Sequence, residues 1–183
     1  MALSLEQIIA NALKQIGHSS DAQKTSEWND QFMNYANEAQ LDLARHARKK
    51  RTEDLVVTDG MILRTSFARE LLKVSSVKSG STSYGFTAED PAAISITGLD
   101  AGTVSVTYEY APEDMKDGQE FPDIPESLHA AIPLYISYRY YMTKDESQQR
   151  RAIMFFDAYE RMKKNYSGNL GGSDQYSLLN VFS

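Results

Sequence analysis

The sequence predicts an α+β protein: a helical bundle of about four helices, a small antiparallel β domain inserted into it, and an extended C-terminal tail. Apolar residues recur at helical spacing near both ends of the chain and at alternate positions between them. The 183 residues fit one domain with a smaller insertion. We therefore expect a helical domain at 1–53 and 111–166, a β-rich domain at 54–110 and a tail at 167–183.

A capping box predicts the first helix. Ser4 precedes the apolar pattern, and Gln7 stands three residues later, where its side chain can reach back to the Ser4 backbone. The apolar positions that follow have helical spacing; they are Leu5, Ile8, Ile9, Ala12, Leu13 and Ile16. Since Gly17 suits a helix end, the pattern predicts a helix over residues 5–16.

A longer helix is predicted over residues 26–47, after a polar loop at 18–24. One stripe of this helix is apolar, with Met33 and Ala36 beside it; its members are Trp28, Phe32, Tyr35, Ala39 and Leu43. Basic residues follow at its C-terminal end; they are Arg45, His46, Arg48, Lys49, Lys50 and Arg51. Positive charge there complements the helix dipole.

The period then changes to that of strands. Residues 55–58 and 61–64 flank Asp59-Gly60, and we expect these two strands to form a hairpin around that turn. The other expected strands are 70–78 (ambiguous at its start), 83–87, 93–97 and 103–110. In the last of these, alternate residues form one apolar face: Val104, Val106, Tyr108 and Tyr110. Five or six short strands favour a small antiparallel sheet or a sandwich.

Two further helices follow a polar linker at 111–120. We expect Asp123 to cap the first, with Glu126 as capping-box partner, and Pro133 to kink it near Ala130. The second is predicted over 145–165, with an inner face made of Ala152, Phe155, Phe156, Tyr159 and Met162.

The last stretch combines a glycine-rich lead, at Gly168, Gly171 and Gly172, with a short apolar segment. The apolar residues of that segment are Tyr176, Leu178, Leu179, Val181 and Phe182. One interpretation is a frayed terminus. The other is a segment that orders on a partner surface.

Composition narrows the function classes. The absence of cysteine excludes disulfides, thiolate metal sites and cysteine nucleophiles. We expect no secretory signal, and no apolar run reaches the roughly 18 residues of a membrane span. The net charge of −6 argues against general duplex binding by the whole domain, which needs a basic surface.

Motifs for catalysis are absent from the sequence. The three histidines, His18, His46 and His129, have no second histidine at ligand spacing, and no phosphate-cradling glycine loop occurs. Acidic residues at 113–120 hint at calcium but lack the spacing of a calcium loop, so a solvated linker is the better interpretation. We expect no enzyme activity, no cofactor and no metal site.

Two groups of residues are candidates for contacts with partners. The basic residues Arg45, Arg48, Lys49, Lys50 and Arg51 are either a solvated helix end or a contact for DNA phosphates or an acidic surface. The tyrosines form the second group. Tyr135 and Tyr138 suit core packing, and the candidates for a contact between subunits are Tyr138, Tyr140 and Tyr141. Simple half-burial explains the second group equally well.

The order of these parts resembles the adaptor proteins of tailed-phage necks, the head-to-tail connectors beneath the portal. The resemblance covers nearly the whole chain and is carried by the entry FPDIPESLHAAIPLYISYRYYM, by a helix ending in ERMKKNY and by the loose apolar tail. Its most specific residues are Ile124, Pro125, His129, Ala130 or Ala131, Ile132 and Tyr135.

The resemblance implies a homo-oligomer, a dodecameric ring that continues the DNA channel of the portal while duplex DNA passes without sequence-specific binding. It implies that residues 171–183 dock on the portal protein and that the β domain meets tail, nozzle or stopper proteins. The protein would be made in the host bacterial cytoplasm, would lie in the virion neck and would contact no membrane. The large β insertion departs from the plainest helical members and leaves the tail type open.

Two other functions stay open from the sequence. One is a tail-completion or stopper protein of the same neck, and the other is a small DNA-binding module that uses residues 45–51. A small enzyme has no positive support.

Overall fold

The computed structural model describes residues 2–18 and 22–166, with the side chains of 22–28 left out. It divides into two compact units. The helical unit holds residues up to 39, 117–121 and those from 125 onward, and the sheet unit holds 40–116 and 122–124. Within these described residues, four α-helices and one six-stranded sheet confirm the expected α+β class.

Helix α1 (Leu5–Gln15) forms as its capping box predicts. The Ser4 backbone N–H donates to Gln7 Oε1 at 3.1 Å, and the Gln7 N–H donates to Ser4 Oγ at 3.4 Å. Gly17 ends the helix with a φ of 84°, a left-handed conformation that glycine adopts without strain. The predicted apolar face is buried; its residues are Leu5, Ile8, Ile9, Ala12 and Leu13.

The sequence predicted a solvated linker at 111–120, but in the structure part of this segment is hydrogen-bonded to α1 or buried. Its residues Gly118 and Glu120 accept the N–H groups of Glu6 and Leu5 at 2.9 and 2.8 Å. The N–H groups in the first turn of a helix have no acceptor inside that helix. This segment supplies acceptors for two such N–H groups of α1. Earlier in the linker, Met115 is only 3% exposed.

Helix α2 (Ala22–Ala47) begins four residues before the predicted start. The apolar stripe is confirmed where side chains are described, by the buried residues Phe32, Tyr35, Ala36, Ala39 and Leu43. The helix ends before Arg48, whose φ is 49°. The expectation that all the basic residues sit at a helix end is therefore wrong, because Lys50 and Arg51 belong to the first strand.

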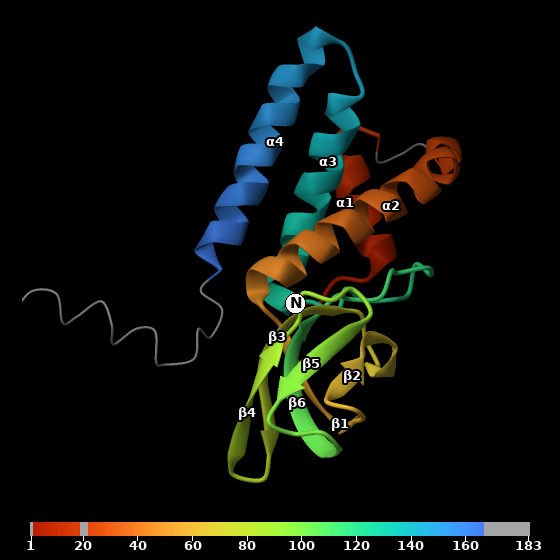
Figure 1. Ribbon diagram of the computed structural model, residues 1–183. Helices are drawn as coiled ribbons and strands as arrows, with labels where there is room; N and C mark the ends of the chain where they lie inside the picture. Colours follow the sequence, from red (N-terminus) through yellow and green to blue (C-terminus); the bar gives the residue numbers. More distant parts are fainter. Residues whose placement is uncertain (1, 19–21, 167–183) are drawn as a thin grey trace, which may run out of the picture. The chain divides into compact units, whose positions relative to one another are not determined.

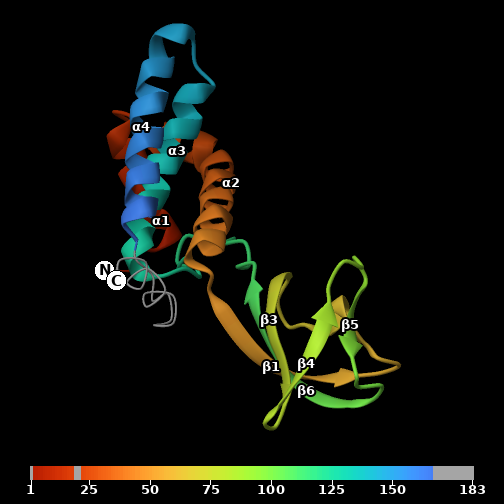
Figure 2. The same cartoon turned by 60° about the vertical axis from the view of Figure 1, so that its left-hand side comes forward.

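The strands form one sheet in the order β1-β6-β3-β4-β5-β2, with every neighbouring pair antiparallel. Their bounds are β1 (Lys50–Val57), β2 (Met61–Leu63), β3 (Leu71–Ser79), β4 (Thr82–Thr87), β5 (Ala93–Thr97) and β6 (Gly102–Tyr110), with a 3₁₀ turn η1 (Arg64–Ser66) after β2. The sheet curls, so that its end strands β1 and β2 come near each other (Figures 1 and 2).

The Asp59-Gly60 turn forms, but the predicted hairpin does not. Both turn residues have positive φ, 51° and 71°, as the hairpin turn requires. Only Thr58 and Met61 bridge across it. Beyond that bridge, β1 pairs along its whole length with β6, and β2 pairs with β5. The long β6 edge offers β1 eight residue partners, which a three-residue strand cannot match.

Apolar side chains fill the inside of the curl. The face of β6 that the sequence predicted is buried; its residues are Val104, Val106, Tyr108 and Tyr110. Together with neighbours such as Val57, Ile62 and Ile94, they form one cluster of buried residues. Register shifts in β3 mark bulges, which bend a strand and increase its twist.

The helix pair begins differently from the prediction. A 3₁₀ turn η2 (Glu126–Ala131) precedes α3 (Ile132–Met142), and no side chain caps either start. The Asp123 capping box is thus wrong, because the Asp123 carboxylate instead forms an ion pair with Lys49. Pro133 lies in the first turn of α3, where a missing N–H breaks no helical hydrogen bond, so no interior kink arises.

Helix α4 (Glu146–Asn165) has a narrower inner face than predicted. Ala152 and Tyr159 are buried, whereas Phe155 and Met162 are half-buried and Phe156 is 39% exposed. Figures 1 and 2 show α4 lying along α3, and both η2 and α3 contact it. Within the described residues, no helix is long and apolar enough to cross a membrane.

One tyrosine gives the sheet unit a pH-dependent stability. The Tyr108 side chain is fully buried, with the Phe67 ring edge-on at 4.8 Å. Burial, helped by the neighbouring Glu53 carboxylate, raises the pKa of the Tyr108 hydroxyl from its usual 10 to about 12.

We predict that alkaline pH destabilises the protein through Tyr108. Below pH 10 the hydroxyl is neutral in both states; between about pH 10 and 12 it ionises in the unfolded chain first. Stability should fall across this window by about 2 to 3 kcal/mol. Denaturant titrations of wild type and Tyr108→Phe at pH 8 and 11.5 measure the effect. A variant that loses as much stability as wild type contradicts it.

Candidate functional site

A groove runs along the helical unit between α1 and α4, with α3 as its floor. Helix α1 is parallel to α3, since Leu3 contacts His129 and Gln15 contacts Ser137. Helix α4 is antiparallel to α3, because the ring pairs Tyr135–Tyr159 and Tyr141–Phe155 lie 5.2 and 5.7 Å apart. Two helices on one floor leave a channel between them, and three cavities lie along it.

The middle cavity has a volume of about 430 Å³ and is mainly apolar. Its apolar lining comes from Leu134, Tyr141, Met154, Phe155 and Ala158. The next cavity towards the α3–α4 turn, about 330 Å³, shares Tyr141 and Arg151 with it. The third, about 360 Å³, shares Gln15 and reaches Pro133 at the start of α3. The three cavities therefore neighbour one another, and the middle one is lined by α1, α3 and α4 together.

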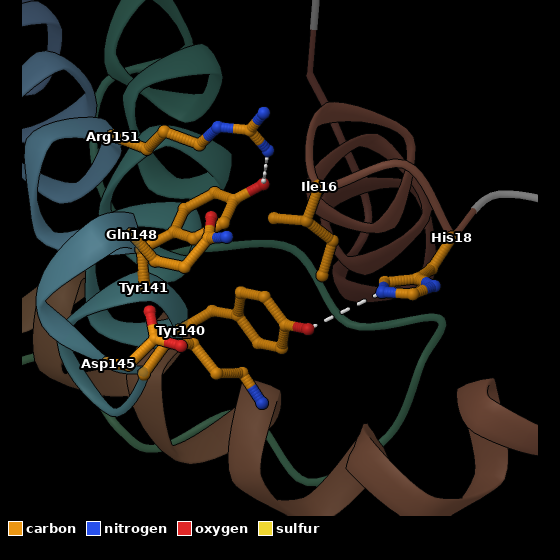
Figure 3. Close-up of a pocket in the computed structure, with 8 residues that line it drawn as sticks. Ile16, His18, Tyr140, Tyr141, Asp145, Gln148 and Arg151 are labelled. Atoms are coloured by element: carbon orange, nitrogen blue, oxygen red, sulfur yellow. Dashed lines mark hydrogen bonds between the residues drawn. The ribbon is translucent and has the colours of Figure 1, made fainter.

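The end of the groove at the α3–α4 turn is polar and basic (Figure 3). The Tyr140 hydroxyl and His18 Nε2 share a hydrogen bond of 3.4 Å, and the Arg151 guanidinium donates to the Tyr141 hydroxyl at 3.3 Å. Lys144 Nζ lies 4.5 Å from the centroid of the Tyr140 ring. With Asp145 as its one acidic residue, this cavity has a net positive charge.

Three large apolar side chains of α4 are exposed among its polar ones. Ile153 is 60% exposed, Met154 is 71% exposed and Phe156 is 39% exposed. Met154 also lines the middle cavity, whereas Phe156 contacts Tyr138 on the flank of α4 away from the groove. The exposed apolar side chains of α4 are therefore candidates for contacts with another protein surface.

Chemically, the groove suits recognition of a polypeptide. Aromatic rings, a methionine and an arginine line it, and these residue types are enriched at protein interfaces. Among residues 2–18 and 22–166, no three His, Asp or Glu side chains come close enough to hold a metal ion. His129 is 2% exposed and accepts the Leu3 N–H at Nδ1, 3.1 Å away.

The candidate tyrosines occupy different environments. Tyr138 is half-buried, with its ring 4.9 Å from that of Phe156, on the flank of α4 away from the groove. Tyr140 is half-buried at the polar end of the groove. Tyr141 is only 5% exposed and forms a wall of the groove, which leaves little of it for a second subunit. Tyr135, expected in the core, is half-buried.

A seam between α2 and α3 was not predicted from the sequence. The Arg139 guanidinium forms an ion pair with Glu38 and lies 4.6 Å from the Tyr35 ring centroid. Burial raises the pKa of the nearby Tyr135 hydroxyl, with Arg139 opposing this effect and Glu38 adding to it. This network fixes the flank of α3 that carries Tyr138.

The basic residues near the end of α2 divide into two groups. Lys49 is paired with Asp123, and Arg51 is paired with Glu53. Arg45, Arg48 and Lys50 are exposed. The apolar tail residues Tyr176, Leu178, Leu179, Val181 and Phe182 lie outside the described residues.

The groove itself escaped the sequence interpretation, although a signal was present. Ile153, Met154, Phe155 and Phe156 are four consecutive apolar residues in a helix. Because successive residues are 100° apart, four in a row must point to more than one face. One face of α4 packs on α3, and the surplus lines the groove and the outer face.

We predict that Phe155 stabilises the groove wall while Ile153 does not. Phe155→Ala removes a ring stacked on Tyr141, with an angle of 8° between the ring planes, and should cost about 2 kcal/mol. Ile153→Ala, on the exposed face, should change the free energy of unfolding by less than about 0.5 kcal/mol. Urea unfolding of both variants gives the comparison; equal losses would show that the wall is wrongly assigned.

Comparison with known proteins adds the family. Residues 4–178 match the family described as SU10 adaptor protein, which covers nearly the whole chain. No curated protein matches. The resemblance to phage adaptors is thereby confirmed, and the chain belongs to the SU10 adaptor protein family.

Proposed function

We propose that the chain is one subunit of a homo-oligomeric ring, a dodecamer by analogy with phage adaptors, that joins the portal to the tail. In this proposal the four helices form a bundle that packs between neighbouring copies, and the ring continues the DNA channel of the neck. Membership of the adaptor family supports a structural role in the virion. A tail-completion or stopper protein, lower in the same neck, is the nearest alternative.

The observation that carries the proposal is the exposed apolar surface of α4. A closed ring needs two different surfaces on each subunit, because every copy contacts its two neighbours through unlike faces. Ile153 and Phe156 supply one such surface, with Tyr138 beside Phe156. When a neighbouring subunit covers this surface, its apolar area is removed from water. This burial stabilises the contact by about 25 cal/mol per Å². An isolated subunit keeps that area exposed.

The remaining parts of the proposal concern partners. Residues 171–183 dock on the portal protein, and the sheet unit meets tail, nozzle or stopper proteins. The net charge of −6 suits a channel through which duplex DNA slides, since phosphates are not held by a surface of their own sign.

We predict that charge on α4 prevents ring assembly. Ile153→Glu with Phe156→Glu buries two carboxylates at the contact between neighbours, and loss of two such apolar contacts should weaken association at least about tenfold. Both positions are exposed in the subunit, so folding should persist. Native mass spectrometry of the protein mixed with the portal protein of the same phage counts the copies.

The control carries the same change in net charge at exposed polar positions, Gln149→Glu with Arg150→Gln, and should assemble as wild type does. If the double glutamate variant forms the same ring, α4 does not lie between neighbours. If wild type never forms a multimer, the ring itself is wrong.

A second candidate, a DNA-binding module, is favoured by one observation. Arg45, Arg48 and Lys50 are exposed cations close together in the sequence. Three phosphate contacts would give a slope of about −2.7 for the logarithm of the binding constant against that of the salt concentration. Fluorescence anisotropy with a duplex at 50 to 200 mM salt measures it, and Arg45→Gln with Arg48→Gln should flatten it. No measurable binding at 50 mM removes this candidate.

A further inference from the structure

We propose that the groove between α1 and α4 binds the apolar C-terminal segment of the same chain, residues 176–182, in the free subunit. The ligand is thus a short peptide of aromatic and aliphatic residues, supplied in cis. This goes beyond ring assembly and portal docking, because it concerns the subunit before it meets any partner.

The groove leaves an apolar surface uncovered by the described residues. Its middle cavity holds about 430 Å³ between Leu134, Phe155 and Ala158, and Met154 at its mouth is 71% exposed. Several aliphatic side chains fit that volume. In water this surface favours any apolar segment held close to it.

The tail starts at the correct end of the groove. Since α4 runs antiparallel to α3, its last residues lie at the level of η2, and Ala130 of η2 lines the cavity that reaches Pro133. From Tyr166 back to Met154 the helix axis measures about 18 Å at 1.5 Å per residue. Between Tyr166 and Leu179 the extended chain spans about 40 Å. The apolar segment therefore reaches the middle cavity with slack.

The composition of the tail matches the lining of the groove. Tyr176, Leu178, Leu179, Val181 and Phe182 are apolar or aromatic, as the middle cavity is. Asp174 carries the only charge between residues 167 and 183. The groove supplies Lys14 and Arg151, and among the described residues neither forms an ion pair. One acidic residue ahead of an apolar segment is therefore complementary to this groove.

The chain allows a direct test because it contains no cysteine. Ala158→Cys with Leu179→Cys places one thiol in the groove and one in the tail. The control, Asp157→Cys with Leu179→Cys, moves the first thiol by one residue to the exposed face of α4. The tail is attached at the same point of the chain in both proteins. A difference in their rates of disulfide formation therefore measures docking of the tail in the groove. Both proteins are oxidised at low concentration without the portal protein.

We expect the groove pair to form a disulfide within one chain at least about tenfold faster than the control pair. Equal rates would show that the tail does not prefer the groove. Disulfides that join two chains would assign the groove to another copy, and either result overturns the proposal. Non-reducing electrophoresis and intact mass separate the outcomes.

Hydrogen exchange gives an independent measurement on the cysteine-free chain. Relative to their intrinsic exchange rates, amides of residues 176–182 should be more protected than those of 168–172, and Ala158→Arg should abolish this protection while Asp157→Arg preserves it. Equal protection in wild type contradicts docking. Neither measurement involves ring formation, so docking and ring assembly fail or succeed separately.

Discussion

The sheet unit depends on one buried amide, that of Gln40. Gln40 is 1% exposed; its Nε2 donates to the Glu113 carbonyl at 2.9 Å, and its Oε1 accepts the Asp123 N–H at 2.7 Å. The sheet is inserted into a helical sequence, so the chain must leave β6 and return for η2 beside the same stretch of α2. The Gln40 side chain therefore holds both the segment that follows β6 and the segment that precedes η2. Removing this side chain would leave two backbone groups without a hydrogen-bond partner, which should lower the free energy of unfolding by about 1 to 3 kcal/mol for each group.

Ion pairs reinforce the same two segments. Arg69 pairs with Glu113, and Lys49 pairs with Asp123, so the two segments that Gln40 contacts are each held a second time. Lys49 was a candidate for DNA contact, and this pairing gives it a structural role. The exposed cations Arg45, Arg48 and Lys50 remain candidates for contact with a partner.

In the helical unit, α3 is central and α4 is peripheral. Helix α3 contacts α1, α4 and, through Tyr140 and Phe32, also α2. Its ring-rich surface is consumed by these contacts, and Tyr141 shows this best at 5% exposure. Helix α4 packs on α3, and α3 covers only part of the apolar residues of α4. The surplus divides between the groove and the outer face, and two separate sets of uncovered apolar side chains follow from that imbalance.

Several local signals in the sequence were reliable, although the Asp123 capping box was not. The Ser4–Gln7 box, the Asp59-Gly60 turn and the alternation along 103–110 each depend on residues a few positions apart, and each is present in the structure. Pairing of β1 with β6 joins residues about fifty positions apart, so the turn alone could not predict it. Gln40 looked like any polar helix residue, because its partners are distant backbone groups.

The same limit applies to the groove, which arises from how three helices meet. The sequence predicted an aromatic helix pair that needs cover, but it could not say which rings the pair would bury itself. Tyr141 was expected at an interface and is buried, while Phe156 was expected inside and is partly exposed. The exposure of both residues depends on the position of α4 on α3, which no local sequence pattern encodes.

The most direct measurement of the central claim is electron microscopy of the intact virion at side-chain resolution. The proposed ring is closed and lies between portal and tail, with Ile153 and Phe156 of each copy covered by its neighbour. Density that places the chain elsewhere in the particle, or a ring in which those two side chains face solvent, would contradict it.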